Sequence, residues 1–385
     1  MGAKICIFFH FVVKYTHSIK KGEKMKRILL SIISLLLVVS MLSSCSGRKI
    51  LRTKEITDVI SSTNVVLYDF VSENADYENY LNVFEPSFRT PGLFEGIIPQ
   101  GICYNFDKNW IIISGYYEDG EFPSMLMILD AENGAFIKAV KLQNVDGSMY
   151  FGHAGGVASS GSYIFVTSDY SARTVAIDTL EKAQNGATVR FVSDFKLNTK
   201  GSFANVYSEI LWVGDFVESA DSARKEAKWV TTIDSGETFY AYCEGYNLKD
   251  GLPKIEKINS THDGYVPDIM LAIPEQVQGM TRTLSGGFIF STSYGRKTDS
   301  VIKVFNDVTE GDRVDTIEID GSKINLYACD ELDMKTSYIA PPMSQGIESV
   351  NGTIFLLYES GAAKYRSGGG KYPVDTLFKA ELTRY

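Results

Sequence analysis

The stretch VQGM at positions 277–280, followed by FIFSTSY at 288–294, decides the fold class. A short segment containing glycine opens the unit, a turn follows, and an apolar strand then ends in small, polar or aromatic residues. Three further stretches follow the same plan: PQGI at 99–102 with WIIISGY at 110–116, GGV at 155–157 with YIFVTSD at 163–169, and QGI at 345–347 with IFLLYE at 354–359. A fourth, SFA at 202–204 with LWVGDF at 211–216, follows it more loosely, with Phe203 in place of the glycine. A unit that recurs in this way predicts a repeat architecture.

Each copy continues into further strand-like runs. They lie at 125–129 and 136–142, at 174–177 and 189–197, at 239–243 and 254–258, at 301–305 and 314–319, and, after the last copy, at 376–382 only. Modules of four strands are typical of propeller blades, so the sequence predicts an all-β protein, a β-propeller of five four-stranded blades.

The last copy has three strands, and an open blade would leave unpaired edge groups. We expect the strand-like residues 64–71 to complete it, so that an N-terminal strand closes the last blade. Two alternatives stay open: a β-sandwich with accidental internal similarity, and a sixth blade within 64–97 or 321–340. Short helices are expected at 219–228 and 329–338.

Composition agrees with a folded β protein and limits its partners. The chain is 44% hydrophobic and 12% aromatic, which supplies a large core, and 22% charged, which argues against disorder. Residues 1–44 hold seven of the 38 basic and one of the 47 acidic residues. The remainder therefore has 31 basic and 46 acidic residues and a net charge of −15, which would repel nucleic acid.

The N-terminal region has the order of an export signal. Lys26-Arg27 precedes an apolar run at 28–42, which is too short to span a membrane comfortably, and Ser43-Ser44 leads to Cys45. The sequence LSSC at 42–45 resembles the bacterial lipobox, in which the cysteine is lipidated. A plain signal peptide with an incidental cysteine is the alternative.

These features divide the chain. We expect 1–24 to be an upstream extension from a mis-called start, 25–44 a lipoprotein signal peptide, 45–62 a tether, and 63–385 a single propeller domain. The protein would then lie on the outer face of the cytoplasmic membrane, attached to it by its lipid anchor alone. The three remaining cysteines, Cys103, Cys243 and Cys329, are widely spaced and are expected to be buried free thiols.

The repeats resemble an uncharacterised family of secreted or lipid-anchored β-propeller-like proteins of Gram-positive bacteria. The likeness covers about residues 95–382 and is carried by Gln100-Gly101, Gly152-His153-Ala154-Gly155-Gly156, Val213-Gly214-Asp215, the stretches at 277–280 and 291–296, Gln345-Gly346 and the stretch at 359–365. The resemblance implies a fold and an extracytoplasmic location, and it brings no activity.

Propeller geometry predicts where a site would lie. The start of the first strand of a blade and the end of the second emerge on the same face, beside the central channel. The residues at those positions and in the adjoining loops are the candidate ligand-binding set: Gln100, Tyr116, His153, Asp169, Asp215, Gln278, Tyr294, Arg296, Gln345 and Glu359. Polar groups that converge on a concave rim indicate a binding site.

Structural explanations compete with this interpretation. The repeated glycines are expected to let backbones approach near the axis. The glutamines can link neighbouring blades, and His153 can satisfy buried backbone groups. Asp169, Asp215 and Glu359 offer oxygen ligands that suit Ca²⁺, although no cofactor or metal is required. The same carboxylates offer the acid and base of a glycosidase.

We therefore expect a lipid-anchored module that binds a carbohydrate, a peptide or a cell-envelope protein through one face of its channel. No nucleophile motif points to a reaction. The alternative is an extracytoplasmic hydrolase or lyase that acts on glycans through the carboxylates at the channel mouth.

Overall fold

Strands make up most of the regular structure in the computed structural model, which describes residues 75–118, 120–219, 228–254, 264–367 and 369–382. The helical elements there are short: η2 (Ala75–Tyr77), α3 (Glu78–Leu81), α4 (Ile177–Lys182), η3 (Val308–Glu310) and α6 (Ala363–Ser367). In the described part of the chain, no helix is long and apolar enough to cross a membrane.

Three sheets contain the copies that begin at positions 99, 155 and 345. The first joins β2 (Ile97–Asn105), β3 (Trp110–Tyr117), β4 (Met125–Asp130), β5 (Phe136–Gln143) and β9 (Thr188–Arg190) in that order. The second joins β6 (Gly156–Ser159), β7 (Tyr163–Ser168), β8 (Ser171–Ala176) and β10 (Ser193–Lys196). The third joins β24 (Ser344–Val350), β25 (Thr353–Tyr358), β26 (Thr376–Ala380) and β1 (Glu85–Arg89).

The copies that begin at 202 and 277 form the two remaining large sheets. One runs β11 (Phe203–Tyr207), β12 (Ile210–Gly214), β15 (Ala241–Lys249), β17 (Ile269–Ile273), β22 (Ser322–Ala328) and β21 (Asp315–Ile319), with β16 (Leu252–Pro253) paired to β15. The other runs β18 (Val277–Arg282), β19 (Phe288–Thr292), β20 (Ser300–Phe305) and β23 (Met334–Ala340). A small hairpin joins β13 (Thr231–Thr232) to β14 (Thr238–Phe239).

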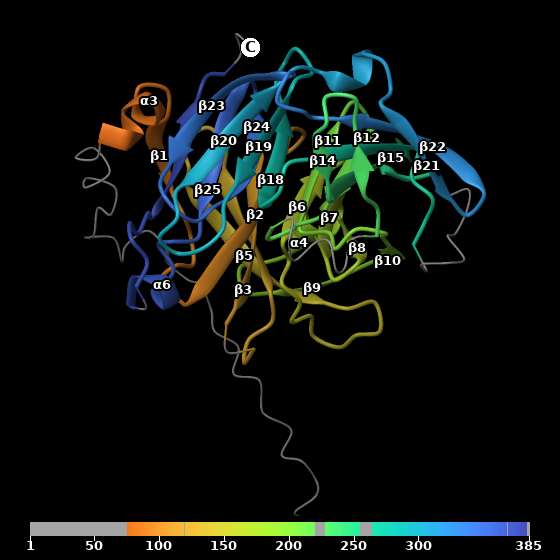
Figure 1. The fold of residues 1–385 in the computed structure, drawn as a ribbon. Helices are drawn as coiled ribbons and strands as arrows, with labels where there is room; N and C mark the ends of the chain where they lie inside the picture. Colours follow the sequence, from red (N-terminus) through yellow and green to blue (C-terminus); the bar gives the residue numbers. More distant parts are fainter. Residues whose placement is uncertain (1–74, 119, 220–227, 255–263, 368, 383–385) are drawn as a thin grey trace, which may run out of the picture. The chain divides into compact units, whose positions relative to one another are not determined.

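The innermost strands of these sheets contact one another around an axis (Figure 1). Strand β2 contacts β24 and β6, β11 contacts β6 and β18, and β18 contacts β24. The arrangement is an all-β propeller. Neighbouring sheets cover both faces of each sheet, and this explains why the second strands are continuously apolar. In β3, for example, Ile112 packs toward Ile164, while Ile111 and Ile113 pack toward Phe355.

Glycines bring the innermost strands together. A Cβ atom on Gly101 would lie 2.7 Å from the backbone nitrogen of Val157, and one on Gly156 would lie 2.6 Å from that of Ala204. A Cβ atom on Gly279 would lie 2.8 Å from the Cα atom of Gly346. The space left between these strands is about 10 Å³, so main-chain atoms close the axis. The expected role of the glycines in close backbone approach is confirmed.

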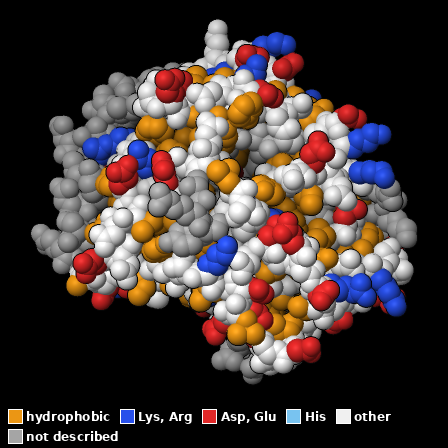
Figure 2. Space-filling view, turned by 90° about the horizontal axis from the view of Figure 1, so that it is seen from above, with side chains coloured by type: hydrophobic (Ala, Val, Ile, Leu, Met, Phe, Trp, Pro, Cys, Tyr) orange, Lys and Arg blue, Asp and Glu red, His pale blue; other side chains and the backbone are white. Residues whose placement is uncertain are grey.

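The surface carries mixed charge where it can be seen. Figure 2 shows acidic, basic and hydrophobic side chains interspersed over one face of the molecule, with no broad basic patch among the described residues of that face. This agrees with the acidic composition of the chain beyond residue 44.

The strand that completes the sheet of β24 is not the predicted one. Strand β1 (Glu85–Arg89) pairs antiparallel with β26 and takes the outermost position. Residues 64–71 lie outside the described residues. Phe88 of β1 stacks on Phe355 and packs against Gly134 in the neighbouring sheet, so its ring helps to fix β1 in this place.

Two other strand predictions assigned residues to the wrong sheet. The run at 189–197 divides into β9, which pairs in parallel with β5, and β10, which pairs with β8. The run at 314–319 contains β21, which joins β22 on the sheet of β11. Single-sequence patterns show that a strand forms but not which neighbour it pairs with, because the pairing depends on long-range contacts.

Residues 329–338 are not helical, because β23 begins at Met334 and supplies the outer strand beside β20. Residues 321–340 thus contribute to two existing sheets rather than to a further blade. The run predicted at 239–243 becomes the longer β15, and its outer neighbour is β17, which the sequence analysis did not identify. Most of the runs predicted at 254–258 and 219–228 lies outside the described residues.

The predicted state of the cysteines is confirmed. Cys103, Cys243 and Cys329 are free and buried. Burial raises the pKa of each thiol well above its usual value, so these side chains remain neutral core residues.

The close approach at the axis can be tested by adding a methyl group. Gly279→Ala should lower the free energy of unfolding by about 1–3 kcal/mol, because the new Cβ atom would overlap backbone atoms that cannot move aside. Gly311→Ala is the matched control, since its nearest neighbour is 3.6 Å away. Equal stability of the two variants in guanidinium unfolding would contradict the closed axis.

Candidate functional site

A pocket of about 500 Å³ lies at one end of the innermost strands, directly beside the closed axis. We call it the axial cup. It is lined by Gln100, His153, Gly155, Ser168, Asp169, Tyr170, Lys200, Gly201, Ser202, Phe216, Gln278, Ser293, Tyr294, Gly295, Arg296, Met343, Glu359 and Tyr365. Its size is within the usual range of small-molecule pockets.

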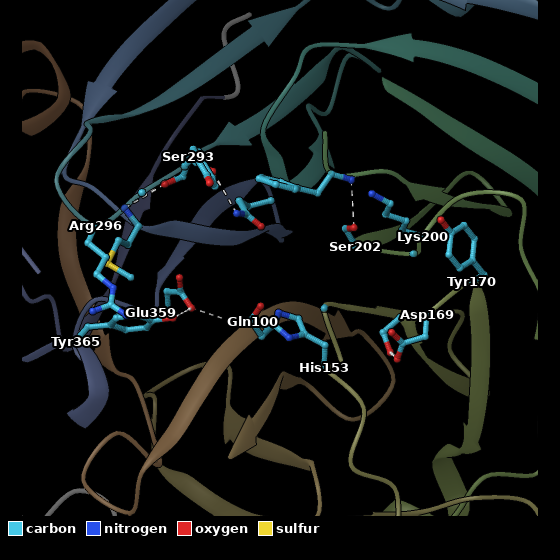
Figure 3. Close-up of a pocket in the computed structure, with 18 residues that line it drawn as sticks. Gln100, His153, Asp169, Tyr170, Lys200, Ser202, Ser293, Arg296, Glu359 and Tyr365 are labelled. Atoms are coloured by element: carbon cyan, nitrogen blue, oxygen red, sulfur yellow. Dashed lines mark hydrogen bonds between the residues drawn. The ribbon is translucent and has the colours of Figure 1, made fainter. Parts of the chain in front are cut away.

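The axial cup contains seven of the ten predicted residues: Gln100, His153, Asp169, Gln278, Tyr294, Arg296 and Glu359. They come together because each precedes an axial glycine, or follows a second strand on the same face. Figure 3 shows Gln100 and His153 between Glu359 on one side and Asp169 on the other. Of the three carboxylates expected at one mouth, Asp169 and Glu359 line the axial cup and Asp215 does not.

The other three predicted residues support the wall instead of lining it. The Tyr116 ring lies against the His153 ring, with 4.3 Å between the centroids. Gln345 is buried and hydrogen-bonds to Glu359. The Asp215 carboxylate accepts a hydrogen bond from the backbone N–H of Lys200. These three residues contact lining residues instead of lining the axial cup, and their role in binding stays a prediction.

Glu359 is the best-connected acid of the axial cup. Gln100 Nε2 donates to its Oε2 over 3.0 Å, and the Tyr365 hydroxyl donates to the same atom over 3.2 Å. Burial raises the pKa of Glu359 to about 7, although the hydrogen bonds from Gln100, Gln345 and Tyr365 oppose that shift. Near neutral pH the carboxyl group is therefore partly protonated.

His153 has the opposite response to burial. Desolvation lowers its pKa below the usual value, while the negative charge of Asp169 partly raises it. The imidazole is therefore mostly neutral at neutral pH. Together with Tyr116 behind it, it forms an aromatic section of the wall.

A second buried acid network holds the rim near Lys200. Glu244 is fully buried and accepts hydrogen bonds from Asn198 and Thr199, both from their backbone N–H groups and from their side chains. The segment that leads to Lys200 is thus fixed from beneath. Burial raises the pKa of Asp215 beside it to about 7.

The carboxylates do not assemble a metal centre. Among the described residues, no group of three or more His, Cys, Asp or Glu side chains is arranged to hold a metal ion. Asp169 and Glu359 line the axial cup without Asp215. The axial cup offers amides, hydroxyls and a carboxyl group for hydrogen bonding, and Lys200 and Arg296 add positive charge.

Sequence reasoning missed several lining residues. Tyr170 lies in the turn between β7 and β8, Lys200 and Ser202 lie in the segment between β10 and β11, and Tyr365 lies in α6. Tyr170 directly follows the predicted Asp169, so a two-residue turn between β7 and β8 was a usable signal. Tyr365 had no such signal, because its place depends on how α6 folds back over Glu359.

Comparisons with known proteins give only distant structural likenesses. No family model matches the chain, and no curated protein matches it. Among solved structures, glutaminyl cyclase of Myxococcus xanthus is 9% identical, with 77% of this chain and 92% of that chain covered and a TM-score of 0.39. The PQQ-bound aldose sugar dehydrogenase of Streptomyces coelicolor is 12% identical, with 78% and 97% covered and a TM-score of 0.40.

A third solved structure, BamB of Moraxella catarrhalis, is 8% identical, with 74% of this chain and 84% of that chain covered and a TM-score of 0.30. These structural neighbours are β-propeller-like. At such identities and TM-scores they carry no argument about function. The resemblance to a Gram-positive lipoprotein family remains a prediction from the sequence.

The raised pKa of Glu359 predicts a pH-dependent stability. The unfolded chain releases this proton near the usual value of 4.5, whereas the folded protein holds it to about 7. Stability is therefore full below the first value and falls as the pH rises through the second. Relative to wild type, Glu359→Gln should gain about 2–3 kcal/mol between about pH 4 and pH 8.

Guanidinium unfolding at the two pH values measures this difference. Glu132→Gln, in an exposed turn, is the matched control and should follow the wild-type protein. A Glu359→Gln variant whose stability runs parallel to wild type over this range would contradict a proton held by Glu359.

Proposed function

We propose that this chain is an extracytoplasmic binding module, a propeller of five blades closed by an N-terminal strand, that takes up a small polar ligand in the axial cup. The blade number is supported by the closed succession of β2, β6, β11, β18 and β24. The position of β1 beside β26 supports closure by an N-terminal strand.

One observation carries the binding function: polar side chains from several sheets converge on a concave space that main chain closes at its base. Gln100 comes from β2, Gln278 from β18, and Glu359 follows β25. The hydrogen bond between Gln100 and Glu359 joins two sheets and holds both groups in place before a ligand arrives. Such pre-organisation lowers the entropic cost of binding.

Backbone strain at the rim supports the same site. Asp169, Tyr170 and Met343 line the axial cup, and all three have positive φ angles, of 53°, 58° and 69°. Left-handed backbone is unfavourable for residues with a Cβ atom, and such strain clusters at functional sites.

A second candidate function is hydrolysis or elimination on a glycan. It is favoured by Glu359, which keeps its proton near neutral pH in a pocket and so has the property of a general acid. Asp169 would then be the second carboxylate. Binding requires only that polar groups converge on the pocket, whereas catalysis also requires a correctly placed acid and base. Binding is therefore our first choice.

For location, we propose export and attachment of a lipid to Cys45, followed by a tether that leads to the propeller. The order of basic, apolar and small residues before Cys45 supports this proposal. The ligand would then be a carbohydrate, a peptide or a protein of the cell envelope, and neither nucleic acid nor a cofactor is needed.

The binding function predicts that loss of both cup amides weakens capture. In array and pull-down assays with plant and cell-wall oligosaccharides and peptides, the double variant Gln100→Ala, Gln278→Ala should bind at least about tenfold more weakly. Asp312→Ala, exposed and remote from the axial cup, should bind like wild type. Undiminished binding by the double variant would refute the site, and release of products from the glycans would favour the second candidate function.

The proposed lipid anchor predicts that loss of Cys45 changes the cell fraction in which the protein is found. In a bacterial host, Cys45→Ala should move the protein from the membrane pellet to the soluble extracytoplasmic fraction, because the lipid has lost its attachment atom. Cys6→Ala should leave the protein in the pellet. A Cys45→Ala protein that stays with the membrane would show that another segment anchors it.

A further inference from the structure

The turn between β7 and β8 combines an unfavourable backbone with an exposed aromatic residue. Ser168 pairs with Ser171, so Asp169 and Tyr170 alone form the turn. Their φ angles are 53° and 58°, as in a type I′ turn, whose central residues both need a positive φ. Glycine is favoured at the second position because it has no Cβ atom.

Three other two-residue turns of the chain follow this preference. Asp250-Gly251, Asp320-Gly321 and Asn351-Gly352 join β15 to β16, β21 to β22 and β24 to β25, and each has glycine second, with φ angles of 80°, 72° and 87°. At the same turn position, Tyr170 costs stability that glycine would not. A fourth two-residue turn, Ser208-Glu209 between β11 and β12, has glutamate second with a φ angle of 58°, so glycine is preferred at this position but not obligatory.

Tyr170 differs from Glu209 in its location. It lines the axial cup beside Asp169 and Lys200 (Figure 3) and keeps half of its surface exposed, at 50%. Its main chain is fixed, since its N–H donates to the carbonyl of Lys200 and its carbonyl accepts from the N–H of Leu197. The ring thus stands at the rim on a rigid base.

A second exposed aromatic residue lines the cup. Tyr294 is 43% exposed, and its ring lies 5.9 Å from that of Phe216. Aromatic rings at the rim and amide and hydroxyl groups deeper in the pocket form an amphipathic site. A pyranose ring matches this distribution, because its C–H face packs on an aromatic ring while its hydroxyls donate and accept hydrogen bonds at the edge.

We propose that the ligand is a carbohydrate and that Tyr170 is the aromatic residue on which a sugar ring packs. This inference rests on the proposed binding function. The tyrosine at a glycine-preferring turn position is then a cost in stability that binding offsets. A peptide is the competing ligand, and the test includes it.

The experiment measures binding and thermal stability on the same variants. Isothermal titration would use cellotetraose, xylotetraose, maltotetraose and tetragalacturonate as sugar probes and tetra-alanine as the peptide probe. For the sugar that binds wild type, Tyr170→Gly should raise the Kd at least about fivefold while the Tm stays the same or rises by about 1–3 °C. Tyr170→Trp, which keeps an aromatic ring, should restore affinity.

Glu209→Gly is the matched control. Ser208 and Glu209 form a two-residue turn between β11 and β12, with φ angles of 53° and 58°, at the other end of the strands from the axial cup. This variant should gain stability in the same way without any change in Kd. If Tyr170→Gly binds like wild type, or lowers the Tm without changing the Kd, the proposal is overturned.

The probes also separate the two proposals. Binding of tetra-alanine alone, weakened by Gln100→Ala, would overturn the carbohydrate ligand and leave the binding function in place. Failure of every probe, sugar and peptide, to bind wild type would overturn both.

Discussion

Main-chain contact between the innermost strands is the constraint on which the rest of the structure depends. Adjacent strands meet at Gly101, Gly156, Gly279 and Gly346, where a Cβ atom would lie within 2.8 Å of a neighbour's backbone. The contact closes the axis, so the mouth becomes a pocket with a base instead of the opening of a channel. It also fixes the residues just before each glycine at that mouth, and a structural requirement of the repeat thereby places Gln100 and Gln278 in one site.

Desolvation gives the interior its chemistry. Glu359 and Asp215 lie at or beneath the cup and Glu348 lies near the far end of β24, and burial raises the pKa of these acids to about 7, 7 and 8. The neutral forms suit a low-dielectric interior because they donate as well as accept hydrogen bonds. The same shift prepares Glu359 for either proposed role, as a hydrogen-bonding group toward a sugar hydroxyl or as an acid toward a glycosidic oxygen.

The sequence predicted more of the inner than of the outer structure. The glycine repeats and second strands are local patterns, so they located the innermost strands, the mouth and seven lining residues. The outer strands β9 and β21 were misassigned because their partners lie on neighbouring sheets, and β23 was missed because residues 329–338 were expected to form a helix. In the site, Tyr170 was missed although it follows Asp169, and Tyr365 depends on the path of α6, which no local pattern reports. An N-terminal strand was expected to close the last blade, but at residues 64–71 and not at β1. The packing of Phe88 on Phe355 helps to fix β1 in its place.

The central claim is that a closed axis creates one binding cup. A crystal structure of the protein soaked with cellotetraose or, failing that, with the other sugar probes tests it most directly. We expect sugar density in the axial cup, against the Tyr170 ring and within hydrogen-bond distance of Gln100 or Glu359. Density elsewhere on the molecule, or an open channel running past Gly279 and Gly346, would contradict it.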